Sequence, residues 1–263
     1  MSDAGSHTVW WQRLRPWWQP AVDFLFPPAC LVCGSSPGDG GGAFCDACAD
    51  QLQNAPGPHC ARCGAAVGPN LVTLSSCGHC HGDHFAFRRV MALGVYDGAL
   101  QTAIGRGQLV HGGPLMRGLT DLLIADQLTE FLAEEFDAIV PVPQDWQRRF
   151  FGIHSAAETI AERLSERLQR PMRASILRKP RPTPPQTGAA PSIRREQQRG
   201  AFEVPAGTDL TGARLLLADD VLTTGATAEA ATRALRKAGV ADVVVAVIAR
   251  GLGVSSVRAA RME

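Results

Sequence analysis

The sequence of 263 residues lacks any long uninterrupted apolar run, and this absence excludes a conventional transmembrane helix. Such a helix needs about 18 or more consecutive apolar residues, and no segment of the chain approaches that length. The N-terminal residues also lack the layout of a secretory signal peptide, because Arg13, Arg15 and Pro16 interrupt their apolar stretches. We therefore expect a cytoplasmic protein without a membrane span, in a compartment where thiols stay reduced.

An excess of charge of one sign is also absent, since the net charge is +1 at neutral pH. A global basic field therefore cannot provide affinity for nucleic acid, and any such affinity needs a local patch. Four of the five tryptophans lie near the start of the chain, at Trp10, Trp11, Trp17 and Trp18. This Trp-rich segment, residues 1–25, is either a contact for a partner or membrane surface or a short helix laid on the body of the protein.

The eight cysteines form four C-x-x-C pairs, and none is left over. Two thiolates three positions apart on a tight turn can reach one tetrahedral ion, so two pairs complete a site with four cysteine ligands. Disulfide bonds are the alternative, which a reducing compartment disfavours. The pattern therefore predicts two structural zinc sites in residues 26–84, with the ligands Cys30, Cys33, Cys45, Cys48, Cys60, Cys63, Cys77 and Cys80.

The spacing leaves the pairing of these cysteines open between a sequential and an interleaved arrangement. We favour the sequential one, in which the first pair shares a metal ion with the second and the third with the fourth. Because four cysteines already complete each site, nearby histidines are expected at the surface rather than among the ligands; they are His59, His79, His81 and His84. The segment has little apolar periodicity, so we expect metal binding to supply its folding free energy.

From residue 85 onward, short apolar runs alternate with segments of helical spacing. The expected strands are residues 88–96, 138–142, 214–218 and 243–248, and the expected helices are residues 114–136, 155–169 and 226–238. Ser155 and Glu158 form a capping box at the start of the second helix. This alternation predicts an α/β domain over residues 85–263, with a parallel sheet flanked by helices, behind the small cysteine-rich module.

Residues 173–202 interrupt that alternation. Five prolines exclude regular structure, and seven basic residues face a single acid, Glu196. A loop of this length inside a compact domain is usually functional or disordered. This basic loop suits a polyanion such as a diphosphate or a nucleic acid; the alternative is a solvated linker.

Two adjacent carboxylates, Asp219 and Asp220, come directly after the apolar run 215–218. In an open parallel sheet, ligands bind beyond the carboxyl ends of the strands. The turn that follows, residues 223–227, is rich in hydroxyls and leads into a helix N-terminus, where free N–H groups and the helix dipole attract a phosphate. Carboxylates accept hydrogen bonds from vicinal hydroxyls, so the segment predicts a site for a ribose 5-phosphate. A P-loop is the competing phosphate site, but its lysine is missing.

This stretch resembles the phosphoribosyl pyrophosphate (PRPP) motif of type I phosphoribosyltransferases; its residues are Asp219, Asp220, Val221, Leu222, Thr223, Thr224, Gly225, Ala226 and Thr227. Other segments are similar to the ComF family of competence-associated, phosphoribosyltransferase-like proteins. They are Tyr96-Asp97-Gly98, Pro141-Val142-Pro143 with Arg148-Arg149-Phe150-Phe151-Gly152, and Arg178, Thr183, Gln186 and Arg194 with Gly200-Ala201-Phe202. The resemblance implies a type I phosphoribosyltransferase-like fold preceded by a double zinc ribbon.

The resemblance also implies roles by position. Asp219 and Asp220 would hold the ribose hydroxyls, residues 223–227 would surround the 5-phosphate, and magnesium would bridge the diphosphate and ribose oxygens. Residues 178–202 would close over the site as a lid. The candidates around the pyrophosphate and in this lid are Arg148, Arg149, Arg178, Thr183, Gln186 and Arg194.

The chain departs from the family pattern on the pyrophosphate side. The lysine and aspartate of an "LKY.GD"-like segment are missing from residues 108–113, and Phe151 stands where an arginine is usual. Two functions therefore stay open. One is a phosphoribosyltransferase that uses PRPP and an unidentified acceptor. The other is a non-catalytic binding protein of DNA uptake or recombination, whose zinc module and basic loop contact single-stranded DNA or a protein of the competence machinery.

Overall fold

The computed structural model describes residues 27–37, 42–55, 57–68, 77–144, 155–180 and 200–251. The Trp-rich segment, residues 1–25, lies outside this part of the chain. The chain divides into two compact units, Met1–Cys48 and Ala49–Glu263. Within the described ranges, each helix is too short or too polar to cross a bilayer.

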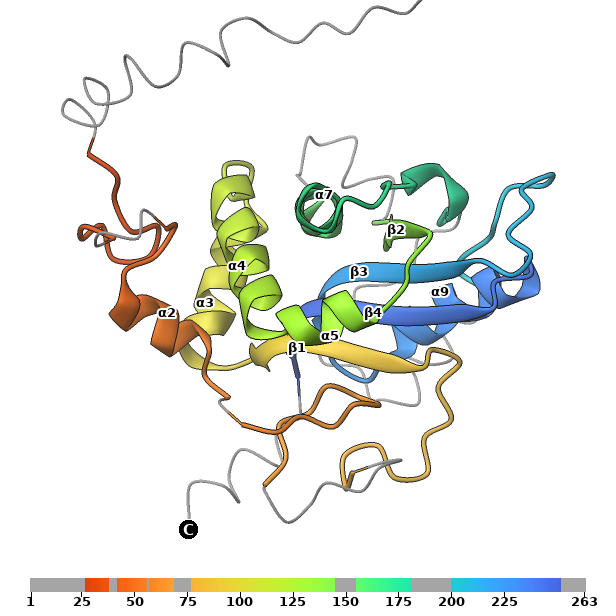
Figure 1. Ribbon diagram of the computed structural model, residues 1–263, viewed down its shortest axis with the longest axis horizontal. Coiled ribbons are helices and arrows are strands. Elements are labelled where there is room, and N and C mark those ends of the chain that lie inside the picture. Colours follow the sequence, from red (N-terminus) through yellow and green to blue (C-terminus); the bar gives the residue numbers. More distant parts are fainter. Residues whose placement is uncertain are drawn as a thin grey trace, which may run out of the picture. The chain divides into compact units, whose positions relative to one another are not determined.

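The second unit contains a four-stranded sheet in which every neighbouring pair of strands is parallel (Figure 1). Its strands are β1 (Arg89–Val95), β2 (Ala138–Pro141), β3 (Arg214–Leu222) and β4 (Asp242–Arg250), in the order β1-β4-β3-β2. After its first residue, β4 is buried along its whole length, which explains its continuous apolar sequence. The predicted parallel α/β sheet is confirmed.

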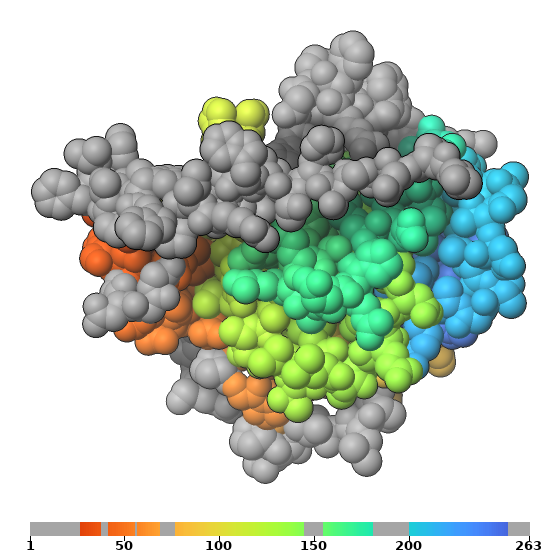
Figure 2. Space-filling view, turned by 45° about the horizontal axis from the view of Figure 1, so that its top comes forward, coloured from red at the N-terminus to blue at the C-terminus, as the bar shows by residue number. Residues whose placement is uncertain are grey.

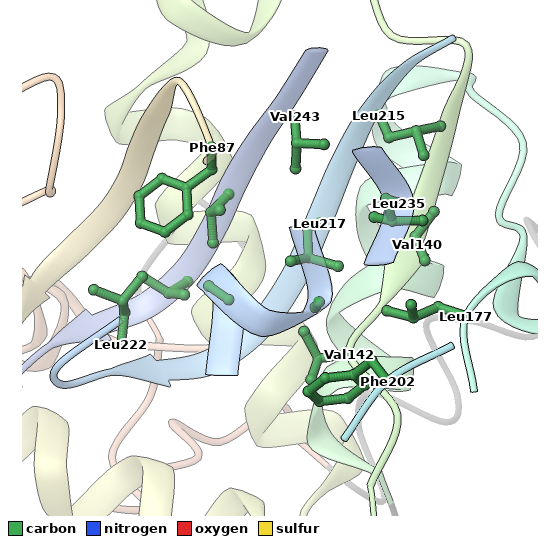
Figure 3. Packing of buried hydrophobic residues seen from close by; sticks show 14 of the residues in the cluster. Phe87, Val140, Val142, Leu177, Phe202, Leu215, Leu217, Leu222, Leu235 and Val243 are labelled. Carbon is green, nitrogen blue, oxygen red and sulfur yellow. The ribbon is translucent and has the colours of Figure 1, made fainter. Parts of the chain in front are cut away.

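Helices cover both faces of the sheet. The helices of the described residues are α2 (Asp46–Leu52), which spans the boundary between the two units, α3 (Gly98–Gly107), α4 (Gly113–Asp126), α5 (Leu128–Ala133), α7 (Ala156–Leu168) and α9 (Ala226–Lys237), with a 3-10 turn at η2 (Ala174–Ile176). One face packs against α9 and forms a cluster of buried hydrophobic side chains. Figure 3 shows members of this cluster from β2, β3, β4 and α9. Figure 1 shows α3, α4 and α7 on the other face, and the space-filling view in Figure 2 shows α7 (teal) beside α4 and α5 (yellow-green).

The amphipathic pattern of α7 explains why it packs where it does. Ile160 and Leu164 are fully buried, and each such side chain contributes about 1.5–3 kcal/mol relative to an exposed one. The predicted cap is present, because the Ser155 hydroxyl accepts a hydrogen bond from the Glu158 backbone N–H at 3.2 Å. The helix ends at Leu168, and the next residue, Gln169, caps it in the left-handed conformation (φ 53°).

The structure differs from the sequence-based expectation at several elements of this unit, and α3 was not expected at all. The single helix expected over residues 114–136 is two helices, because Gln127 leaves the helical conformation and donates its side-chain amide to the Ala92 carbonyl at 2.5 Å. The strand expected to end at residue 218 continues to Leu222, since its pairing with β4 continues to Arg250. The acid pair, Asp219 and Asp220, therefore lies within the last residues of β3 rather than after it.

Candidate functional site

The first cysteine group lies in the first unit and consists of Cys30, Cys33, Cys45 and Cys48, whose sulfur atoms all lie within 4.8 Å of one another. Gly34 forms the tight turn of this group, with φ +77° and a hydrogen bond from its N–H to the Cys30 carbonyl at 2.9 Å. Cys33 is exposed and Cys45 is half-buried. The group joins the first C-x-x-C pair to the second.

The second cysteine group repeats this geometry in the second unit. Its ligands are Cys60, Cys63, Cys77 and Cys80, which are all buried and lie within 4.8 Å of one another. Gly64 has φ +69° and donates its N–H to the Cys60 carbonyl at 2.8 Å. The sequential pairing is thus confirmed, and no histidine belongs to either group in the part of the chain that the structure describes.

The electrostatics of the first cysteine group favour a bound cation. Burial opposes ionisation of the Cys30 thiol, but backbone N–H donors, first among them that of Cys33, lower its pKa to about 6. The side chain of Cys33 and burial raise the pKa of Cys48 to about 12. Four thiolates in one place therefore repel one another, and a bound metal ion reverses this balance. Four sulfur ligands at this spacing fit tetrahedral zinc, so both groups are suited to a structural zinc ion.

The acid pair occupies the carboxyl end of β3, and both residues are partly exposed rather than sealed in the apolar core. The Asp220 carboxylate accepts a hydrogen bond from the Gln108 side-chain amide at 2.6 Å. The Asp219 carboxylate accepts one from the Asp220 backbone N–H at 3.0 Å. Burial of the carboxyl group, and then the negative charge of Asp220, raise the pKa of Asp219 well above its ordinary value. The pair thus holds two acceptors close together at the edge where parallel sheets bind ligands.

The turn between β3 and α9 leads the backbone into a helix N-terminus. Gly225 caps α9 in the left-handed conformation (φ 75°), and the Thr224 hydroxyl accepts a hydrogen bond from the Ala226 N–H at 3.3 Å. A Cβ at Gly225 would lie 3.0 Å from the Phe85 ring, so both the conformation and the close approach require glycine. Thr227 lies in the first turn of α9. Residues 223–227, called the phosphate loop hereafter after their predicted role, therefore present a helix N-terminus and hydroxyls next to the acid pair along the chain.

Sequence reasoning missed Arg250, a buried cation at the carboxyl end of β4 with 5% exposure. Its Nε donates to the Cys63 carbonyl at 2.8 Å, and its Nη1 donates to the Leu222 carbonyl at 3.0 Å and to those of Thr223 and Gly251. The guanidinium therefore joins a ligand residue of the second cysteine group to the phosphate loop. The available signal was a charge at the end of an otherwise apolar strand.

The remaining predicted site residues divide into two sets. Arg178 is exposed and pairs its backbone with that of Glu203 through two hydrogen bonds of 2.9 Å. It therefore closes the base of the basic loop. The other candidates lie outside the described residues; they are Arg148, Arg149, Thr183, Gln186 and Arg194.

A cavity of about 600 Å³ lies beside the phosphate loop. It is lined by Thr224, Gly225 and Ala226, by residues of α9, by residues 82–85, and by Gly200 and Phe202. Neither residue of the acid pair is among the described residues that line it. This cavity is therefore separate from the edge of the sheet where the acid pair lies.

Two protein families match the chain. The double zinc ribbon domain matches residues 21–81, and the phosphoribosyl transferase domain matches residues 121–256, just over half of the chain. Competence protein F of Haemophilus influenzae is 26% identical over 225 residues, which cover 84% of this chain and 96% of that protein. These matches agree with the parallel sheet and the two cysteine groups, and they confirm the expected combination of modules.

Solved structures also resemble part of the chain, among them the following two. The glutamine PRPP amidotransferase from B. subtilis, complexed with ADP and GMP, is 20% identical with a TM-score of 0.35, over 52% of this chain and 27% of that chain. This chain thus spans about a quarter of the amidotransferase's length. A purine phosphoribosyltransferase from Pyrococcus horikoshii Ot3 is 18% identical with a TM-score of 0.31, over 61% of this chain and 78% of that chain.

Proposed function

We propose a function from the premise that this chain belongs to the ComF family, in which a double zinc ribbon precedes a phosphoribosyltransferase domain. The chain binds PRPP or a related ribose 5-phosphate at the carboxyl end of β3. The observation that carries this proposal is one continuous segment that holds two adjacent aspartates, neither of them fully buried as a residue, a left-handed glycine and a helix N-terminus, in that order.

The acid pair serves the ribose diol in this proposal. Asp220 already accepts a hydrogen bond of 2.6 Å from a neutral amide, that of Gln108. A ribose hydroxyl is a neutral donor of the same kind, so it would exchange with the Gln108 amide when the sugar binds. Asp219 adds a second acceptor one residue away, which suits two adjacent hydroxyls.

The phosphate loop serves the 5-phosphate. The first N–H groups of a helix lack partners within the helix and carry the positive end of its dipole, so they favour an anion. Thr223, Thr224 and Thr227 add hydroxyl donors, and Gly225 removes the Cβ that would otherwise obstruct the backbone. The Arg250 guanidinium lies beneath this loop, bonded to the Leu222 carbonyl at 3.0 Å, and adds positive charge.

The diphosphate of PRPP would place further negative charge near two carboxylates. A hard divalent cation with oxygen ligands relieves this repulsion, and Mg²⁺ commonly keeps waters and binds through one or two carboxylates together with substrate phosphates. We therefore include Mg²⁺ as a component of the bound ligand. The raised pKa of Asp219, which burial and the charge of Asp220 cause, marks the carboxyl group that gains most from such a cation.

The reaction that fits this ligand is transfer of the pentosyl group. An acceptor nucleophile would attack C1 of the ribose as the bond from C1 to the pyrophosphate oxygen breaks, and pyrophosphate would leave with the bonding electrons. Positive charge near the leaving group lowers such a barrier. The arginines proposed to supply that charge and the residues proposed to form the closing lid are together Arg148, Arg149, Arg178, Thr183, Gln186 and Arg194.

The relative from Haemophilus influenzae is named Competence protein F. We extend that name to propose that this chain serves DNA uptake or recombination. The alternative, a non-catalytic contact of the zinc module and basic loop with single-stranded DNA or a competence protein, has no favouring contact among the described residues. Most of the basic loop lies outside them.

A thermal shift assay tests the binding proposal. A ligand at about 100 times its Kd adds about 2.7 kcal/mol, so PRPP with Mg²⁺ should raise the Tm by roughly 5–10 °C. The double variant Asp219→Ala/Asp220→Ala should lose this increase, whereas Asp50→Ala, which removes an exposed carboxylate on α2, should keep it. An unchanged Tm in the natural protein would contradict the proposal. Pyrophosphate release with nucleobases, amines or ammonia then separates transfer from binding.

A further inference from the structure

We propose that the second cysteine group is a structural part of the phosphate loop, so that metal in this group controls the affinity of the loop for phosphorylated ligands. Metal in the first group does not. Arg250 is the positioning residue that transmits this effect. The expected effect on ligand affinity rests on the proposed function. The link between the second cysteine group and the phosphate loop does not depend on it.

The first link is the Arg250 guanidinium. It donates at 2.8 Å to the carbonyl of Cys63, which is itself a ligand residue, and at 3.0 Å to the carbonyl of Leu222, the residue before the phosphate loop. It also donates to the Thr223 carbonyl inside the loop. Because Arg250 is buried, these charge-assisted hydrogen bonds are stronger than exposed ones, and losing one leaves a buried N–H donor without a partner.

The second link is the Phe85 ring, which reaches the loop independently of Arg250. Phe85 packs against the second cysteine group and against the core of the sheet, and it stacks on Phe87 with 4.6 Å between ring centroids. Its edge lies 3.0 Å from the place where a Cβ would stand on Gly225. The ring therefore holds in place the residue at which α9 begins.

Metal binding fixes the position of both links. The described residues around the second group, 57–68 and 77–85, have little regular structure besides one isolated bridge between His59 and Ala66. Four buried thiols in contact hold together only weakly without a cation. When the metal is absent, the Cys63 carbonyl is no longer held, Arg250 loses one of its acceptors, and the loop loses a support. The first group lies in the other compact unit, which makes it the matched control.

The test measures hydrogen exchange of the loop amides, residues 222–227, in the full chain without ligand. We expect Cys77→Ser/Cys80→Ser to bind about one zinc ion fewer and to speed exchange of these amides by about tenfold or more, the size expected for losing a charge-assisted hydrogen bond. The matched variant Cys33→Ser/Cys45→Ser should also bind about one zinc ion fewer but leave the loop exchange within about twofold. Equal loop protection in the two variants would overturn the proposal.

A second variant keeps the test decisive if the cysteine variant unfolds. Arg250→Met keeps both cysteine groups, so it should retain about two zinc ions while the loop amides exchange faster and PRPP with Mg²⁺ binds about tenfold more weakly. Arg233→Met removes an exposed charge from α9 instead and should leave both readouts near the natural values. If Arg250→Met leaves the loop exchange unchanged, the coupling is refuted. If the natural protein binds no PRPP, the proposed function fails while the exchange arm still judges the coupling.

Discussion

The two cysteine groups have the same local geometry in different surroundings. Each has a glycine directly after its first C-x-x-C pair, in the left-handed conformation, with its N–H bonded to the carbonyl of the first cysteine of that pair. Yet a Cβ on Gly34 would meet nothing within 4 Å, whereas one on Gly64 would lie 2.8 Å from the Val90 side chain. The first group includes an exposed thiol, and the second is wholly buried.

This difference shows that ligand spacing determines metal binding but not what the metal supports. The second group is bonded to the sheet, since the Val90 N–H donates to the Ala61 carbonyl at 3.0 Å and Arg250 donates to the Cys63 carbonyl. A metal ion in this group would therefore stabilise contacts well beyond its own turn. The structural role of each cysteine group therefore depends on which residues bond to its backbone carbonyls.

The largest expected effect comes from removing one ligand from each group. Cys63→Ser should cost on the order of 3 kcal/mol or more, because it removes the metal from a buried group that supports the sheet and leaves a polar hydroxyl there. Cys33→Ser should cost clearly less, because its side chain is exposed. Urea denaturation monitored by far-UV circular dichroism gives both values. Equal costs would mean that the two groups are equivalent for stability.

The glycines of the two turns test the packing difference alone. Gly34→Ala should cost about 1 kcal/mol, the cost of a left-handed conformation for a residue with a Cβ. Gly64→Ala should cost about 2–4 kcal/mol, because the new methyl group must also displace Val90. Thermal denaturation with measured zinc content checks both. A Gly34→Ala protein that is the less stable of the two would contradict this account.

The smallest expected effect extends the comparison to the acid pair, which also holds like charges together. The pKa of Asp219 is raised by burial and by Asp220, so its contribution to stability is full below the ordinary pKa of 3.8 and is lost as the pH rises through the raised value. Asp219→Asn should therefore raise the Tm at pH 7, by about 2–4 °C per kcal/mol gained. This gain should disappear toward pH 4.

Calorimetry of the natural protein and Asp219→Asn between pH 4 and pH 8 provides the measurement. The same variant should bind PRPP more weakly, because an amide replaces a carboxylate acceptor. A variant that is less stable at pH 7 than the natural protein would show that the charge of Asp219 does not destabilise the folded state.

Local patterns made much of this architecture predictable. The spacing of the cysteines gave two groups of four, the alternation of apolar runs with helical segments gave the parallel sheet, and Ser155 with Glu158 gave the start of α7. Each of these features depends on residues that are near one another in the chain. The choice between sequential and interleaved pairing needed the fold, because both satisfy the same spacing.

The features that the sequence did not reveal depend on distant partners. Gln127 divides one expected helix into two because its amide reaches Ala92, 35 residues earlier. Arg250 is bonded to Cys63 across 187 residues, so neither residue alone indicates the contact. The sequence did not predict that β3 extends through its last residues, because aspartate is a poor strand former. Pairing with β4 nevertheless keeps Asp219 and Asp220 extended.

The antiparallel bridge between Arg178 and Glu203 has a consequence for how the family can vary. It fixes the two ends of the intervening segment side by side, so the length of that segment does not affect the geometry of the sheet. Doubling the length of such a closed segment costs only about 0.6 kcal/mol. Insertions and deletions between these two residues should therefore accumulate among relatives at little thermodynamic cost, while the rest of the fold stays constant.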